Sequence, residues 1–187
     1  IQDEFGFIAS FLMPLIGLAL IAALTRGEEE SGRLEALLAG KIDRRAPVVS
    51  AMMLVLAAVV MMDVGFVLSL LAAGIEFGPA VLYALALGMV TVVFAALAAV
   101  CAQVVLHSRG VFALGFLAVG LSYVLRGVGD VNGTFWVWLS PLGWLEKTAP
   151  FADEQRWWVL LIPILVATAL SFIAIALAHR RDLGAAL

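Results

Sequence analysis

Asp63 is the residue of this sequence with the greatest potential for chemistry, because it lies slightly past the middle of an apolar run that extends from 48 to 73. An ionised side chain at the centre of a transmembrane helix costs about 2.5–3.5 kcal/mol on insertion scales. We therefore expect Asp63 to face the interior of a helix bundle or a wet cavity, or to stay protonated. Two roles fit this position. The carboxyl group either lines a substrate path or partners an inner polar group, or it is neutral and hydrogen-bonded to a neighbouring helix.

Arg126 and Asp130 form a second candidate site, since residues spaced i,i+4 meet on one face of a helix. The pair forms if the fourth apolar segment continues as a helix through both residues. It would then act as an outer gate, as a brace for the segment that follows, or only as a salt bridge at the membrane interface.

Motifs for catalysis or cofactor binding are absent from the sequence. Gly40-Lys41 lacks the upstream glycine and the following Ser or Thr of a phosphate-binding loop, so any ATP, with its Mg²⁺, must be bound by another subunit. His107 and His179 lie at two helix ends, whereas haem ligation would place them deeper in the spans. Cys101 is the only cysteine, which excludes an internal disulfide or a Cys-rich metal site. We expect no catalytic residue, cofactor or metal in this chain.

The polar segment 25–47 contains a candidate docking element. A short helix fits Glu28 to Ala39, with three glutamates in its first turn, where the helix dipole favours negative charge. Glu29 and Arg33 are spaced i,i+4 and should form an ion pair, and three leucines form an apolar stripe at helical spacing. The expected contact residues are Glu28, Glu29, Glu30, Arg33, Leu34, Leu37 and Leu38. The segment is either a solvated linker with basic anchors or a helix that docks into a groove on a cytoplasmic partner.

These residues must be positioned by a membrane-embedded framework. Of the 187 residues, 64% are hydrophobic and 13% are charged, and the mean hydropathy is +1.11. This balance excludes a soluble enzyme and a disordered chain, and a net charge of −3 argues against nucleic acid as a partner. Five continuous apolar runs are long enough, or nearly so, for transmembrane helices rather than barrel strands: 5–24, 48–73, 80–106, 111–125 and 157–178. The fold class is therefore an all-α polytopic bundle.

Lysine and arginine orient the bundle. Eight of the 11 lie on the side of 25–47, 107–110 and 179–187, which we assign to the cytoplasm. All five tryptophans lie in or beside the opposite segment 126–156, where short helices dipping into the outer leaflet would suit them. The first residue is Ile1 rather than Met, so we expect the chain to be part of a longer one. In this orientation residues 1–4 lie on the outer side, so at least one more span should precede them if the true N-terminus is inside.

Several strings together resemble a known family. The loop GEEESGRLEALLAGKIDRRAP is similar to the loop between the second and third spans of type-2 ABC (ATP-binding cassette) exporter permeases. The later strings HSRG, LRGVGD, LSPLGW, PFADEQRWW and HRRDLGAAL resemble the polyketide-antibiotic exporter branch of that family. The resemblance covers nearly the whole chain and is greatest to the first of two six-span halves, without its first span.

The resemblance implies a function and partners. The helix at 28–39 would be a coupling helix seated on a separate nucleotide-binding ATPase subunit, which binds ATP and Mg²⁺, and 126–156 would form outer re-entrant helices. We expect a non-enzymatic permease that exports hydrophobic or amphiphilic compounds (antibiotics, drugs or lipids) across the bacterial cytoplasmic membrane. Its other partners would be membrane lipid and a second half-transporter, in the same chain or as another copy. The main alternative is a proton-coupled secondary transporter or channel that uses Asp63, although proton relays usually contain several acids.

Overall fold

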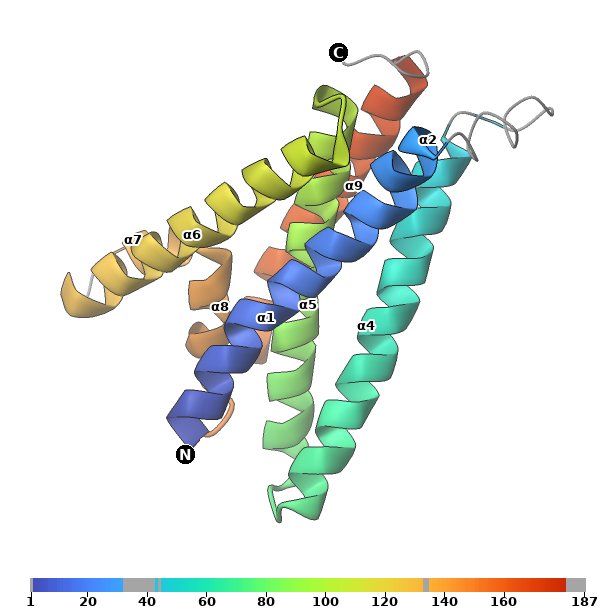
Figure 1. The fold of residues 1–187 in the computed structure, drawn as a ribbon. Coiled ribbons are helices and arrows are strands. Elements are labelled where there is room, and N and C mark those ends of the chain that lie inside the picture. The colour runs from blue at the N-terminus through green and yellow to red at the C-terminus, as the bar shows by residue number, and fades with distance from the viewer. Residues whose placement is uncertain (1, 32–42, 44, 133–134, 181–187) are drawn as a thin grey trace.

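The computed structural model describes residues 2–31, 43, 45–132 and 135–180, and this part of the chain is a helical bundle without strands (Figure 1). Five helical segments are long and apolar enough to cross a membrane: Ala9–Glu30, Ala46–Ala72, Phe77–Val104, Ser108–Val131 and Trp157–Arg180. The polytopic helical fold predicted from the apolar runs is therefore confirmed. The elements are α1 Gln2–Ala22, the π-helix η1 Ala23–Gly27, α2 Glu28–Glu30, α4 Ala46–Ala72, α5 Phe77–Val104, α6 Ser108–Asn132, α7 Trp136–Leu139, α8 Pro141–Lys147, the 3-10 helix η2 Trp157–Leu160 and α9 Leu161–Arg180.

Helix α5 is the centre of the bundle, and α1, α4, α6 and α9 all pack against it (Figure 1). Its sequence is apolar on every side and rich in alanine, as expected for a helix that is surrounded by others. The small residues let helices approach closely. A Cβ atom added to Gly17 of α1 would lie 2.8 Å from the carbonyl oxygen of Thr91, so only glycine permits this crossing.

The outer helices keep large apolar faces exposed, because nothing within the described residues covers them. On α4, for example, Met61 and Leu68 are exposed, whereas Val55 and Val59 are buried against the centre. In a membrane-spanning chain such faces contact lipid or other spans. The turn from α4 to α5 is closed by Gly74, whose φ of +85° is a left-handed conformation that favours glycine.

The first long helix differs from the prediction at its end. We expected a span at 5–24 and a separate helix that begins at Glu28, but the helix continues through η1 into α2 without leaving the right-handed helical region. The three glutamates therefore occupy the last turn of a helix and not the first turn of a new one. The helix dipole disfavours negative charge there, so other contacts must stabilise them. Arg33, Leu34, Leu37 and Leu38 lie outside the described residues.

The fourth long helix is also longer than predicted. α6 runs to Asn132 rather than ending near 125, so Arg126 and Asp130 belong to it and not to the segment that follows. Two short helices, α7 and α8, then fold back toward the bundle, and α8 packs against both α5 and α6. Its residues Leu142 and Trp144 are buried, so apolar packing holds α8 against the bundle.

The described parts of the segments that we assigned to the cytoplasm lie together in space. α2, the first turn of α4, the turn between α5 and α6 and the end of α9 occupy one end of the bundle, called here the loop end (Figure 1). The turn between α4 and α5 lies at the opposite, far end.

Candidate functional site

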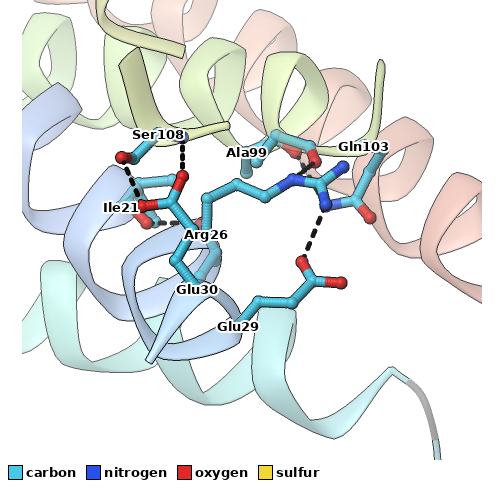
Figure 2. A network of polar contacts seen from close by, with 9 residues as sticks. Ile21, Arg26, Glu29, Glu30, Ala99, Gln103 and Ser108 are labelled. Atoms are coloured by element: carbon cyan, nitrogen blue, oxygen red, sulfur yellow. Dashed lines mark hydrogen bonds and ion pairs between the residues drawn. The ribbon is translucent and has the colours of Figure 1, made fainter. Parts of the chain in front are cut away.

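The loop end contains a buried arginine. Arg26 is 1% exposed, although it follows the apolar part of the first long helix by only a few residues. Its Nε donates a hydrogen bond of 2.7 Å to the carbonyl oxygen of Ala102, and its Nη1 donates one of 2.8 Å to the carboxylate of Glu29 (Figure 2). The guanidinium thus joins the first long helix to the last turn of α5. A buried cation requires such partners, because its desolvation is otherwise costly.

Two further side chains on this part of the bundle satisfy helix carbonyls. Gln103 is buried next to Ala102 and donates from Nε2 to the carbonyl oxygen of Ala99 at 3.1 Å. Thr25 donates from Oγ1 to the carbonyl oxygen of Ile21 at 2.6 Å, beside the widened turn of η1. Figure 2 shows that Gln103 lies beside the Arg26 contacts, and Thr25 directly precedes Arg26 in the chain, so several buried polar groups gather here.

Glu30 connects the same end to α6. Its carboxylate accepts hydrogen bonds from the backbone N–H of Ser108 at 2.8 Å and from the Ser108 hydroxyl at 2.9 Å. Ser108 is the first residue of α6, where the N–H groups of a helix are unpaired and its dipole attracts anions. The glutamates predicted to face an outside partner therefore have internal ones: Glu29 binds Arg26, and Glu30 binds the start of α6. We call Arg26, Glu29, Glu30 and Ser108 the loop-end cluster.

Sequence reasoning missed the role of Arg26, which it counted only among the basic residues of a cytoplasmic loop. The available signal was a single arginine at the end of an apolar run with glutamate three residues later. That spacing brings the two side chains together only if the helix continues, and the predicted span ended at residue 24. The predicted contact between Glu29 and Arg33 is not described by the structure, because Arg33 lies outside the described residues.

Asp63 lies in the interior, as its cost in a membrane predicts. It is 8% exposed and faces α5, where its carboxyl group occupies the space that a Cβ atom on Gly88 would fill. Its Oδ1 atom has no hydrogen-bond partner within the described residues. One of the two roles considered was a neutral carboxyl group that is hydrogen-bonded to a neighbouring helix. The structure contains no such hydrogen bond at Oδ1.

Arg126 makes the predicted contact with Asp130 and a second one that was not predicted. Its Nε lies 3.8 Å from Oδ2 of Asp130, while its Nη2 forms an ion pair with Glu146 of α8. The guanidinium also lies 5.9 Å from the centre of the Tyr123 ring. Burial raises the pKa of the Glu146 carboxyl above its ordinary value, and the nearby guanidinium opposes that rise. Arg126 therefore braces α8 against α6.

Buried hydrogen bonds support the same brace. The hydroxyl of Ser140, at the N-cap of α8, donates to the carbonyl oxygen of Ser122 on α6 at 2.6 Å and accepts from the N–H of Gly143. Trp144 donates from Nε1 to the carbonyl oxygen of Trp138 at 2.7 Å. The folded-back segment is thus held by specific polar contacts as well as by apolar packing.

An apolar groove of about 410 Å³ opens between α4 and α9, with α5 as its floor. Its walls include Met52, Met53 and Phe172, and its polar residues Thr168 and Ser171 donate their hydroxyl hydrogens to carbonyl groups of their own helix. A volume of this size is in the range of small-molecule sites, and this lining suits apolar groups. Within the described residues, no cluster of three or more His, Cys, Asp or Glu side chains could hold a metal ion.

Comparison with known proteins agrees with this architecture. No family model matches the chain. A curated relative, the multidrug efflux system permease protein Rv1217c of Mycobacterium tuberculosis, is 36% identical over an alignment of 193 residues that includes all of this chain. The chain spans 35% of the length of that relative.

Five membrane-length helices define a multi-pass membrane protein, and along its whole length the chain is similar to a permease. The similarity to this efflux permease extends over the whole chain and agrees with the resemblance to type-2 ABC exporter permeases that the loop strings indicate.

Proposed function

We propose that this chain forms part of the transmembrane domain of an exporter for hydrophobic or amphiphilic compounds, powered by separate nucleotide-binding ATPase subunits. The subunits would bind ATP and Mg²⁺, the membrane would be the bacterial cytoplasmic membrane, and the cargo would be antibiotics, drugs or lipids. The name of the relative, a multidrug efflux permease, supports export of small molecules. The apolar groove between α4 and α9 supports hydrophobic cargo.

The buried position of Arg26 is the observation that carries the proposal. A docked ATPase would move the loop between α2 and α4, and this movement must be transmitted to the membrane-spanning helices to drive transport. Arg26 fixes the start of that loop to the Ala102 carbonyl of α5 through a desolvated, charge-assisted hydrogen bond. Because α5 packs against every other long helix, a displacement delivered there is transmitted to the whole bundle.

A second half-transporter would complete the path, in the same longer chain or as another copy. Exposed apolar faces on α4, α6 and α9 are available to it and to membrane lipid. Export then follows from alternating inward and outward access as nucleotide binding closes the partner subunits.

One observation favours a different class of function. Asp63 is a buried carboxyl with an unpartnered oxygen, and intramembrane acids of this kind also carry protons in secondary transporters. A proton-coupled transporter or channel would move solute without nucleotide, and its activity would depend on Asp63.

The test is affinity purification of the tagged full-length permease from its native host in mild detergent, followed by uptake assays in inverted membrane vesicles. We expect a subunit with a phosphate-binding loop to purify in near-stoichiometric amount, and uptake to require ATP. A permease that purifies alone and moves solute along a proton gradient would refute the proposal in favour of the alternative.

A paired substitution tests the docking role of the loop. Changing Leu37 and Leu38 to Ser should release the ATPase, since these residues form the predicted apolar stripe. Val131→Ser on the strongly exposed end of α6 is the control and should leave the ATPase bound. Retention of the ATPase by the double leucine variant would remove the docking role from this stripe.

A further inference from the structure

We propose that Asp63 is a recognition point for positively charged cargo, so that the exporter prefers lipophilic cations to neutral compounds of similar size. This inference rests on the proposed function and names a substrate class for it. The carboxyl group would pair with the positive charge of a compound that enters between the spans.

The first argument is that the group lacks compensation. Asp63 is more than nine-tenths buried, and its Oδ1 has no hydrogen-bond partner within the described residues. Arg26 is paired with Glu29, and Arg126 is paired with Glu146. A buried carboxylate gains far more from a cationic partner than an exposed one does, because desolvation strengthens the attraction.

The second argument is the position of the group on α4. The buried residues of this helix form a stripe that faces α5: Val48, Ala51, Val55, Val59 and Asp63. Asp63 is the last of them, and the helix beyond it has no buried residue. The carboxyl group thus lies where the close packing of α4 on α5 ends. A compound that approaches along the part of α4 after Asp63 can reach it without separating the buried residues of α4 from α5.

The third argument is the composition of the surroundings. Phe66, one turn further along α4, and Met62 are half-buried and pack against a cluster that contains Met13 and Leu87. These side chains suit the apolar body of a compound, and an aromatic ring is also attractive to a cation. A single carboxyl group among apolar side chains distinguishes compounds by their charge and not by their shape. A transporter that accepts many different compounds requires this kind of selectivity.

Gly88 provides a way to disturb the site without removing the charge. A Cβ atom at this position would overlap the Asp63 carboxyl, so Gly88→Ala must displace it. Gly65 on α4 is the matched control, because a Cβ atom there would meet nothing within 4 Å.

The experiment measures ATP-dependent uptake by inverted vesicles that contain the full-length permease with its ATPase. The probes are tetraphenylphosphonium, a permanent cation, and N-phenyl-1-naphthylamine, which is uncharged at neutral pH. Asp63→Asn should weaken the apparent affinity for tetraphenylphosphonium by about tenfold or more, a ratio equivalent to about 1.4 kcal/mol, and leave uptake of the neutral probe within about twofold. Gly88→Ala should shift the same ratio in the same direction, and Gly65→Ala should not.

Three outcomes would overturn the inference. Equal loss of both probes in Asp63→Asn, with normal assembly, would make the residue structural or a partner of another polar group. Unchanged uptake of both probes would remove it from the path. Uptake in wild-type vesicles that needs a proton gradient but no ATP would refute the proposed function itself, and Asp63 would then be a proton carrier.

Discussion

Replacing Arg26 by Met should lower the free energy of unfolding of the full-length permease by about 3–5 kcal/mol, the usual effect of removing one partner from a buried ion pair. Methionine retains an apolar side chain of similar length, so the change removes the guanidinium more than the packing. The change removes the hydrogen bonds to Ala102 at 2.7 Å and to Glu29 at 2.8 Å. Hydrogen bonds of charged groups contribute about 1.5–3 kcal/mol each, which agrees with that range.

A double-mutant cycle separates this pair from its surroundings. Unfolding would be measured by SDS titration in mixed micelles for Arg26→Met, Glu29→Gln and the double variant. The double variant should be at least about 1 kcal/mol more stable than the sum of the single effects predicts, because the second change no longer leaves a buried charge unpaired. Arg180→Met is the control, since Arg180 is exposed at the same end and its loss should change stability by no more than about 0.5 kcal/mol.

The reasoning fails if Arg26→Met costs less than about 1 kcal/mol, or if the two single effects simply add. Either result would mean that the guanidinium is hydrated in the membrane-bound protein and does not connect the first long helix to α5. Lysine provides a finer comparison. Arg26→Lys keeps the charge but has a single nitrogen in place of the planar guanidinium. It should therefore keep only one of the contacts to Ala102 and Glu29, and its stability should lie between those of wild type and Arg26→Met.

The packing of α8 and α6 gives two further predictions. Ser140→Ala should destabilise the permease by about 1 kcal/mol or more in the same titration. The change removes both the N-cap of α8 and a buried hydrogen bond to α6. An unchanged free energy of unfolding would show that α8 is held by apolar contacts alone. Gly129→Ala should be destabilising, since its Cβ atom would lie 2.5 Å from the backbone nitrogen of Val137. A Cβ atom at Gly127 would meet nothing within 4 Å, so Gly127→Ala should be neutral or stabilising by up to about 1 kcal/mol. Similar melting temperatures for the two variants would contradict the close approach of α6 and α7.

The sequence was sufficient to predict features that depend on one segment at a time. Long apolar runs predicted the polytopic helical fold, since a span must satisfy its own backbone in lipid. The inward position of Asp63 followed from the cost of exposing a charge there, and the contact of Arg126 with Asp130 followed from helical spacing. Each of these inferences needs only local periodicity and one transfer free energy.

Contacts between distant segments could not be predicted in this way. The partner of Arg126 on α8 lies 20 residues further along the chain, and the bond between Glu30 and Ser108 joins residues 78 apart. Both depend on how helices fold back on one another. The predicted end of the first long helix was wrong for a related reason. A polar segment that contains glycine resembles a loop, and only the buried contact of Arg26 with α5 explains why this segment stays helical.

Helix α5 connects the two sites and allows the proposed mechanism to be tested across the bundle. Arg26 holds it at Ala102, while Asp63 packs on Gly88, 14 residues earlier and thus about 21 Å along the axis. If α5 moves as a rigid body, ATP should change the distance between spin labels at the exposed positions Val60 of α4 and Phe77 of α5.

The change should disappear in Arg26→Met, even while the ATPase remains bound, and persist in Arg180→Met. If it persists in both variants, the displacement enters the spans by another route. The two hydrogen bonds between Glu30 and Ser108, which lead into α6, would then be the connection that matters. If it is absent from wild type, α4 and α5 move together, and cargo at Asp63 would have to be released by separation of other helices.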